Sequence, residues 1–119
     1  MSAPTGAVSG RTAPADIFRL VAAADGHYTA EGPLTFATAR QARELGAQLL
    51  LAGGGNGAAA LAIDCRGITV SDSAGLAVLL DWLGMARRRG RTLCYTHLPE
   101  GLTALARISE VEELLERGV

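Results

Sequence analysis

The feature that most constrains this fold is a short polar stretch, Asp72–Gly75, placed between two apolar segments. The apolar run Leu61–Cys65 precedes it, and a long pattern of helical spacing begins behind it at Leu76. Together these segments predict a buried strand, a tight turn and a helix that starts at about Ser73. Because the first N–H groups of a helix lack partners within it, this turn is suited to hold a phosphate or to dock a partner's polar group.

Composition narrows the classes of function. The chain has 119 residues, is 49% hydrophobic and carries a formal net charge of −1. This length predicts one domain with its own core. The near-neutral charge argues against nucleic acid as a partner, because such binding needs a strongly basic face. The two cysteines, Cys65 and Cys94, form no metal motif and are expected to be reduced core thiols. We expect no metal and no cofactor.

The N-terminal segment is expected to be a tail. Residues 1–14 are small and polar and contain no apolar core of a signal peptide, so they predict disorder, and residues 15–119 predict the folded domain. The longest apolar helical pattern, Leu76–Ala86, is interrupted by Asp81 and is too short to span a bilayer. We therefore expect a cytoplasmic protein with no direct membrane insertion.

Four strands and four helices are expected in the order β-β-α-β-α-β-α-α, which predicts an α/β fold with a small mixed sheet. The continuous apolar run at residues 61–65 predicts a central strand covered on both faces. The expected strands are 17–23, 27–30, 61–65 and 91–97. The expected helices are one from about 35 to 52, then 73–89, 101–107 and a short last one after residue 109.

Turn and capping residues set the expected boundaries. Thr35, just behind Pro33, is predicted to cap the first helix, and Gly90 is predicted to end the second. Ser109, with Glu112 three residues on, predicts a capping box for the last helix. The sequence Asp25-Gly26 predicts a hairpin turn, and the glycine-rich stretch 53–57 predicts a loop.

Three patterns suggest other chemistry. Ser73 behind a strand resembles the nucleophile of a hydrolase elbow, but Ser71 stands where that motif has its first glycine. The glycine-rich loop at 53–57 lacks the Lys-Ser or Lys-Thr of a phosphate-binding loop. The arginines at 87–89 and 91 form a basic patch, and they also complement the dipole at the end of a helix. We favour the structural interpretation for each pattern and expect no catalysis.

The outer face of the predicted second helix suggests a docking surface. At 100° per residue, Leu76, Leu79, Leu83 and Ala86 point to the sheet, with Leu80 and Trp82 at the edges of that stripe. The opposite face is small-featured, whereas a solvated face more often carries Glu and Lys, and small residues let another protein lie closely on it. The predicted partner-binding residues are Ser73, Ala77, Leu80, Asp81, Gly84 and Arg88.

The segment from Leu61 to Leu76 resembles the STAS domain, named after sulfate transporters and anti-sigma factor antagonists. The resemblance covers roughly residues 17–117 and rests on the strand at 61–65 followed by Asp-Ser-x-Gly-Leu at 72–76. It implies one STAS domain of about four strands and four helices, without catalysis. In this setting Asp64, Asp72 and Gly75 are expected to support the loop that carries Ser73.

Residues 32–38 and 102–107 resemble the MlaB-like branch of the family more narrowly. That branch implies a cytoplasmic subunit of the Mla phospholipid-transport ABC system, which contacts the ATPase subunit through the Ser73 position and the helix behind it. Such a subunit would lie at the inner membrane only through its partner.

The alternative is an anti-sigma factor antagonist, in which a kinase-like anti-sigma factor would phosphorylate Ser73. The usual antagonist carries an acidic residue where this chain has Thr35. This departure favours the transporter branch, while Ser73 keeps phosphorylation open.

Overall fold

The computed structural model describes residues 17–24, 26–52 and 60–117. Its strands are β1 (Arg19–Ala24), β2 (His27–Leu34), β3 (Ala60–Ser71) and β4 (Thr92–Thr96), and its helices are α1 (Ala39–Ala52), α2 (Ser73–Arg88), α3 (Glu100–Ile108) and α4 (Glu112–Arg117). The expected order of strands and helices is confirmed. The expected tail at residues 1–14 and the glycine-rich loop lie outside the described residues.

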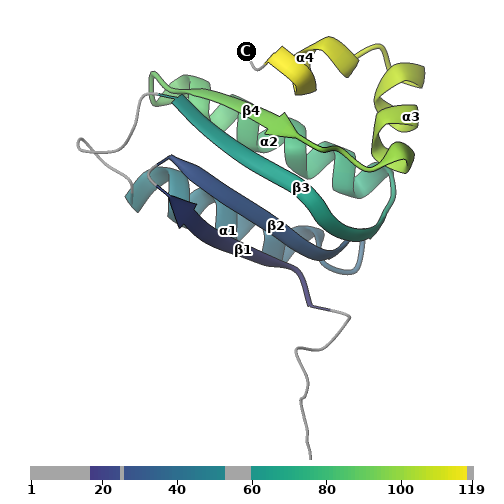
Figure 1. Ribbon diagram of the computed structural model, residues 1–119, viewed down its shortest axis with the longest axis horizontal. Helices are drawn as coiled ribbons and strands as arrows, with labels where there is room; N and C mark the ends of the chain where they lie inside the picture. Colours follow the sequence, from purple (N-terminus) through teal and green to yellow (C-terminus); the bar gives the residue numbers. More distant parts are fainter. Residues whose placement is uncertain (1–16, 25, 53–59, 118–119) are drawn as a thin grey trace, which may run out of the picture.

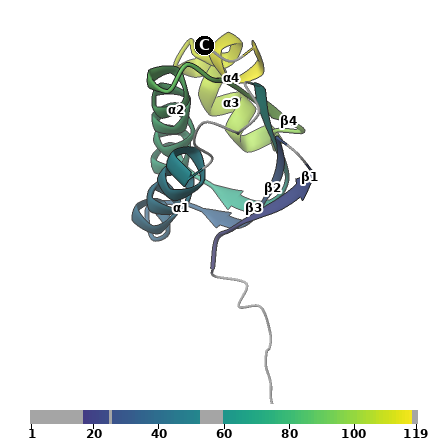
Figure 2. The same ribbon diagram turned by 90° about the vertical axis from the view of Figure 1, so that its left-hand side faces the viewer.

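The sheet is mixed and has the strand order β1-β2-β3-β4. β1 pairs antiparallel with β2, and β2, β3 and β4 run parallel to one another. Helices α1 and α2 lie side by side against one face of the sheet, while α4 packs near β4 and α3 lies between α2 and α4 in the chain of contacts (Figures 1 and 2). The predicted four-stranded α/β fold is therefore present.

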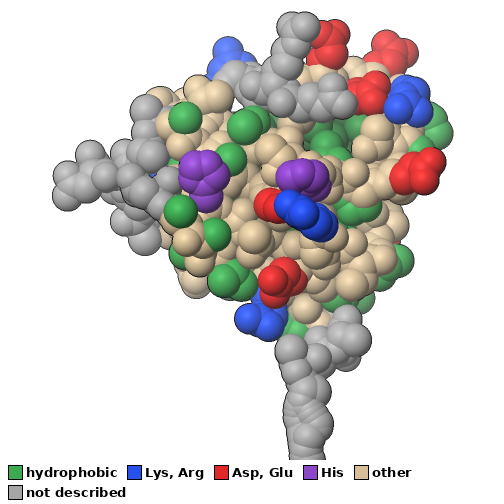
Figure 3. Space-filling model, in the orientation of Figure 1, with side chains coloured by type: hydrophobic (Ala, Val, Ile, Leu, Met, Phe, Trp, Pro, Cys, Tyr) green, Lys and Arg blue, Asp and Glu red, His purple; other side chains and the backbone are tan. Residues whose placement is uncertain are grey.

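Among the described residues, helices cover one face of the sheet, so the expectation that β3 is covered on both faces is wrong. Along β3, Leu61, Ile63 and Cys65 are buried, while Ala62 and Asp64 between them are half-buried. This alternation is typical of a strand with one face on the core. The other face carries charged and histidine side chains (Figure 3). β3 is also longer than the predicted strand at 61–65. It runs from Ala60 to Ser71, the residue before Asp72.

The inward stripe of α2 makes the centre of the core. Leu79 and Trp82 are 0% exposed, and Leu76, Leu83 and Ala86 are also buried. Trp82 was expected at the edge of the stripe, but it lies fully inside because α1 packs alongside α2. The hydroxyl of Tyr95 in β4 donates a hydrogen bond of 2.6 Å to the carbonyl of Leu79 and so ties the helix to the sheet. Gly90, at φ 72°, ends the helix as predicted.

Two predicted caps are wrong. Pro33 lies in β2 and Thr35 lies in the turn behind it, so α1 begins only at Ala39. Thr38 takes the capping place, because its carbonyl accepts the first helical hydrogen bond from the N–H of Ala42 at 2.9 Å. Ser109 is the C-cap of α3 instead of the start of α4, because the chain turns at Glu110 with φ 61°. No helix in the described part of the chain is long and apolar enough to cross a membrane.

Candidate functional site

The N-terminus of α2 is built around the carboxylate of Asp72. The residue is extended, with φ −145°, and its Oδ1 accepts a hydrogen bond of 3.1 Å from the N–H of Gly75. Its carbonyl accepts the first helical bond, 3.1 Å, from the N–H of Leu76. Asp72 therefore caps the helix, as the sequence predicts, and Ser73 is the first residue of α2.

The second oxygen of the same carboxylate reaches a distant segment. Oδ2 of Asp72 accepts a hydrogen bond of 3.0 Å from the N–H of Phe36, in the turn between β2 and α1. These backbone N–H groups, that of Phe36 foremost, hold the pKa of Asp72 below its ordinary value although partial burial acts against them. At the start of α2, where the sequence predicts N–H groups suited to a phosphate, the N–H of Gly75 is thus already engaged by this carboxylate.

Gly75 allows the start of α2 to lie directly on the end of β2. A Cβ atom at this position would come within 2.1 Å of the carbonyl oxygen of Leu34, which is backbone and cannot swing aside. Any side chain at residue 75 would push the helix away from the sheet. Gly75 and Asp72 therefore both support the segment that carries Ser73.

The six predicted partner-binding residues lie along the outer side of α2. Ser73, Ala77, Asp81 and Arg88 are exposed, and Leu80 and Gly84 are half-buried. The structure thus brings these residues together on one helix face, which we call the α2 strip. The α2 strip is low at residue 84, because glycine has no side chain. A Cβ at this position would lie 3.4 Å from Nη1 of Arg88.

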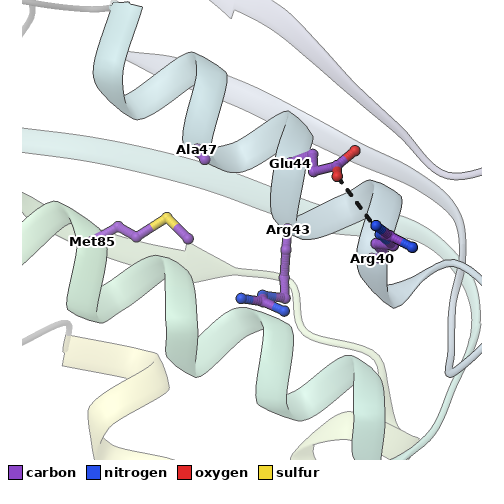
Figure 4. Close-up of a pocket in the computed structure, with 5 residues that line it drawn as sticks. All are labelled: Arg40, Arg43, Glu44, Ala47 and Met85. Carbon is purple, nitrogen blue, oxygen red and sulfur yellow. Dashed lines mark ion pairs between the residues drawn. The ribbon is translucent and has the colours of Figure 1, made fainter.

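A groove between α1 and α2 borders the α2 strip (Figure 4). Nε of Arg43 in α1 lies 3.0 Å from Oδ2 of Asp81, so the ion pair joins the strip to the groove. The hollow has a volume of about 200 Å³ and is lined by Arg40, Arg43, Glu44, Ala47 and Met85. None of these five residues was predicted, because the sequence gives no sign that α1 lies beside α2.

Phe36 was also missed. Its side chain is 83% exposed, and its backbone is bonded to the residue before Ser73. From the sequence, Phe36 falls in the predicted first helix, where an aromatic residue favours burial. Its place beside α2 depends on a contact between segments 36 residues apart in the chain, and no local pattern indicates it.

Asp64 does not lie in the loop that carries Ser73, which corrects that expectation. It lies in the middle of β3 on the uncovered face of the sheet, where it pairs with Thr29 of β2 and Thr96 of β4. Its carboxylate lies 2.9 Å from Nη2 of Arg66 and 3.3 Å from Nδ1 of His97. Hydrogen bonds from Arg66 lower the pKa of Asp64. Asp64 is thus part of a separate surface cluster.

The two cysteines of the chain lie in neighbouring strands of the sheet, Cys65 in β3 and Cys94 in β4. Burial raises the pKa of the neighbouring Cys65 thiol to about 12, which keeps it protonated and unreactive at neutral pH. Both cysteines are free thiols, Cys65 buried and Cys94 half-buried. In residues 17–24, 26–52 and 60–117, no three His, Cys, Asp or Glu side chains are arranged to hold a metal ion.

The chain was compared with known proteins. No curated protein is similar enough in sequence to count as a match. Solved structures share the fold, among them an anti-sigma factor antagonist and a sulfate transporter family protein. The anti-sigma factor antagonist SpoIIAA in its unphosphorylated form is 13% identical, with 84% of each chain covered and a TM-score of 0.57. A sulfate transporter family protein from Wolinella succinogenes is 19% identical, with 82% of this chain and 75% of that chain covered and a TM-score of 0.58.

A sequence-family model agrees with this fold. The model described as "Mlab, STAS domain" matches residues 18–116, nearly the whole part of the chain that forms the sheet and its helices. The matched residues include the strand–turn–helix unit in which Asp72 caps α2 and Ser73 begins the helix. The chain therefore belongs to the STAS domain family.

Proposed function

We propose that this protein is the cytoplasmic STAS subunit of an Mla-type ABC phospholipid transporter, and that it binds and regulates the ATPase subunit through the α2 strip. STAS domains are typically non-catalytic interaction domains. The description of the matching family model supports the Mla branch. A subunit of this kind would lie at the inner membrane only through its partner, and it would serve outer-membrane lipid asymmetry.

The observation that carries this proposal is the shape of the α2 strip at the end that contains Ser73. The hydroxyl of Ser73 and the methyl group of Ala77 are exposed on a helix whose other face is locked into the core. Small side chains on a fixed helix let a partner approach the backbone closely, and a hydroxyl at one end offers a directional hydrogen bond. Proteins that only need solubility there more often carry long charged residues.

An anti-sigma factor antagonist is the second candidate. The fold shared with unphosphorylated SpoIIAA and the exposure of Ser73 both favour it. In this case a kinase-like anti-sigma factor would transfer the γ-phosphoryl group of ATP to Oγ of Ser73, with loss of the hydroxyl proton and release of ADP. The new dianion would stand beside the carboxylate of Asp72, and their repulsion would change the docking surface.

Substitution of Ser73 separates the two functions. The purified Mla-type ATPase subunit from the same organism is titrated with the parent chain and with Ser73→Ala, Ser73→Thr and Ser73→Asp. We expect Ser73→Thr to bind like the parent, Ser73→Asp to lose binding, and Ser73→Ala to bind about tenfold more weakly because a buried partner group loses its hydrogen bond. Melting temperatures should stay close to that of the parent, because the side chain is exposed.

A phospho-switch gives a different pattern. With the kinase-like anti-sigma factor as the titrated protein, Ser73→Ala should bind like the parent. After incubation with ATP, mass spectrometry should then find one phosphate on the parent and none on the variant. If the ATPase binds Ala, Asp and parent chains equally, Ser73 is only the first residue of a helix, and its assignment to the partner site fails.

Bulk on the strip provides an independent test of the docking face. Ala77→Trp should abolish binding while the domain still folds, because residue 77 is exposed. Unchanged binding by this variant would place the docking surface elsewhere on the molecule.

A further inference from the structure

The turn between β2 and α1 presents an aromatic side chain to solvent. Phe36 is 83% exposed, more than the other large exposed apolar side chains of the described residues. These others are Ile17, Val70, Ile108 and Leu114. Single exposed apolar residues are common, so exposure alone indicates nothing. The surroundings of Phe36 distinguish it from the other four.

The backbone that carries Phe36 is fixed by side chains on both sides. Its N–H donates to Oδ2 of Asp72 at 3.0 Å. Oγ1 of Thr38 accepts from the N–H of Thr35 at 3.1 Å and donates to the carbonyl of Pro33 at 2.9 Å. A group held in place before binding loses less conformational entropy when a partner arrives. Since Asp72 immediately precedes Ser73, the fixed backbone that carries this aromatic side chain lies next to the start of the α2 strip.

Arginines border the same surface along α1. Arg40 and Arg43 line the groove between the two helices (Figure 4), and Arg43 pairs with Asp81 of the strip. Arg40 has an exposed side chain, 93% accessible, and only a distant contact of 3.9 Å with Glu44. With Arg88, the surface has three arginines against three carboxylates, those of Glu44, Asp72 and Asp81. The carboxylate of Asp72 accepts backbone N–H groups and that of Asp81 pairs with Arg43, so the accessible guanidinium of Arg40 suits a partner carboxylate at the rim of its site.

We infer that Phe36 is the apolar anchor of the docking surface and that Arg40 and Arg43 form its charged rim. The partner is then a protein with an apolar pocket bordered by carboxylates, placed so that the pocket receives Phe36 while a polar group meets Ser73. This inference rests on the proposed function, because it takes the ATPase subunit as the occupant. Aromatic anchors that enter a pocket carry much of the binding energy of an interface, and rim charges mainly set the association rate.

The test compares Phe36 with an equally exposed side chain elsewhere. Ile108 is 80% exposed at the end of α3, on the far side of α2 from α1 (Figure 1). The purified Mla-type ATPase subunit is titrated with Phe36→Ala, Ile108→Ala and Ala77→Trp. We expect Phe36→Ala to weaken binding by about 30-fold or more, as truncation of an anchor does. Ile108→Ala should change it by less than about threefold, and neither alanine variant should change the melting temperature appreciably.

A double-mutant cycle tests whether Asp72 positions Phe36. Asp72→Asn keeps an oxygen that caps α2, because Asn is as good an N-cap as Asp, but its amide nitrogen cannot accept the N–H of Phe36. We expect this variant to weaken binding in the parent chain and to add little in the Phe36→Ala background. A purely structural role of Asp72 would give equal, additive losses in both backgrounds, and that result would overturn the positioning role.

The rim is tested by association kinetics. Arg40→Gln should slow association several-fold at low salt and leave the dissociation rate nearly unchanged, whereas Arg107→Gln, at the end of α3, should change neither. Equal kinetics for parent and Arg40→Gln would overturn the charged rim.

The binding of Phe36→Ala and of Ala77→Trp, taken together, separates this inference from the proposed function on which it rests. If Ala77→Trp abolishes binding and Phe36→Ala binds like the parent, Phe36 is no anchor and the α2 strip remains the docking surface. If both variants bind like the parent, the proposed docking face itself fails. Loss of binding by both, with Ile108→Ala unaffected, is the result that supports the inference.

Discussion

The start of α2 and the uncovered face of the sheet both contain an aspartate with a lowered pKa, but the two aspartates hold different kinds of partner. Asp72 binds backbone N–H groups of two separate segments, at Phe36 and Gly75. Asp64 binds the side chains of Arg66 and His97, both more than half exposed. The first carboxylate joins separate segments of the fold, whereas the second pairs with neighbouring side chains on the surface. We therefore expect substitutions to cost stability at the start of α2 and little on the open sheet.

A pair of glycines provides the largest test of this difference. At Gly75 a Cβ would lie 2.1 Å from the Leu34 carbonyl oxygen, and at Gly67, on β3, it would lie 2.9 Å from that of Ala30. We expect Gly75→Ala to lower the free energy of unfolding by about 3 kcal/mol or more, although alanine favours a helix, and Gly67→Ala by about 1 kcal/mol. Urea unfolding of both variants measures this. Equal losses of unfolding free energy would show that the backbone is packed equally closely around Gly75 and around Gly67.

The cap on α2 should have an intermediate effect. Asp72→Ala removes the acceptor for Phe36 and Gly75, and loss of a cap costs about 1 kcal/mol. Because the folded pKa of Asp72 lies below its ordinary value, its stabilising contribution is complete above about pH 5 and disappears as the pH falls through the folded pKa. Thermal melts from pH 7 to pH 2 should therefore show the parent and Asp72→Ala converging in acid. A constant difference would mean that packing, and not the carboxylate, accounts for the loss.

The smallest effect is expected on the open sheet face. Asp64→Asn removes the charge that faces Arg66 and His97, and pairs with such exposed partners contribute about 0–1 kcal/mol. The same melts, repeated at low and high salt, should show a small loss that salt reduces further. A loss of stability larger than that of Asp72→Ala would reverse the comparison. The carboxylate on the sheet face would then contribute more to stability than the cap of α2.

Local patterns in the sequence were reliable where one segment determines its own structure. The bounds of α2 follow from Asp72 as a cap, from helical spacing and from Gly90 as a stop, and all three are found in the structure. The inward residues Leu76, Leu79 and Leu83 are buried as their spacing predicts. The order of strands and helices was also predictable, because each element has its own periodicity and turn residues.

Errors arose where the next segment along the chain competed for the same residues. Pro33 and Thr35 have the chemistry of a helix start, yet the chain stays extended through Leu34 because β2 keeps pairing with β3 as far as Ser71. Ser109 has the chemistry of an N-cap, yet it ends α3 with bonds to the carbonyls of Leu105 and Arg107. In both cases residues suited to begin a helix lie at the end of the element before it.

The sequence by itself determined the α/β fold, the cap and inner stripe of α2, and the exposed, small-featured strip that begins at Ser73. Those features depend on the spacing and turn residues within single segments and on the order of these segments along the chain. Only the tertiary structure decided that one face of the sheet is open, that Asp64 belongs to it, and that α1 lies beside α2. It also placed Phe36 next to Ser73, through one hydrogen bond to Asp72. Such contacts depend on the path of the chain between distant residues, which a local pattern does not encode.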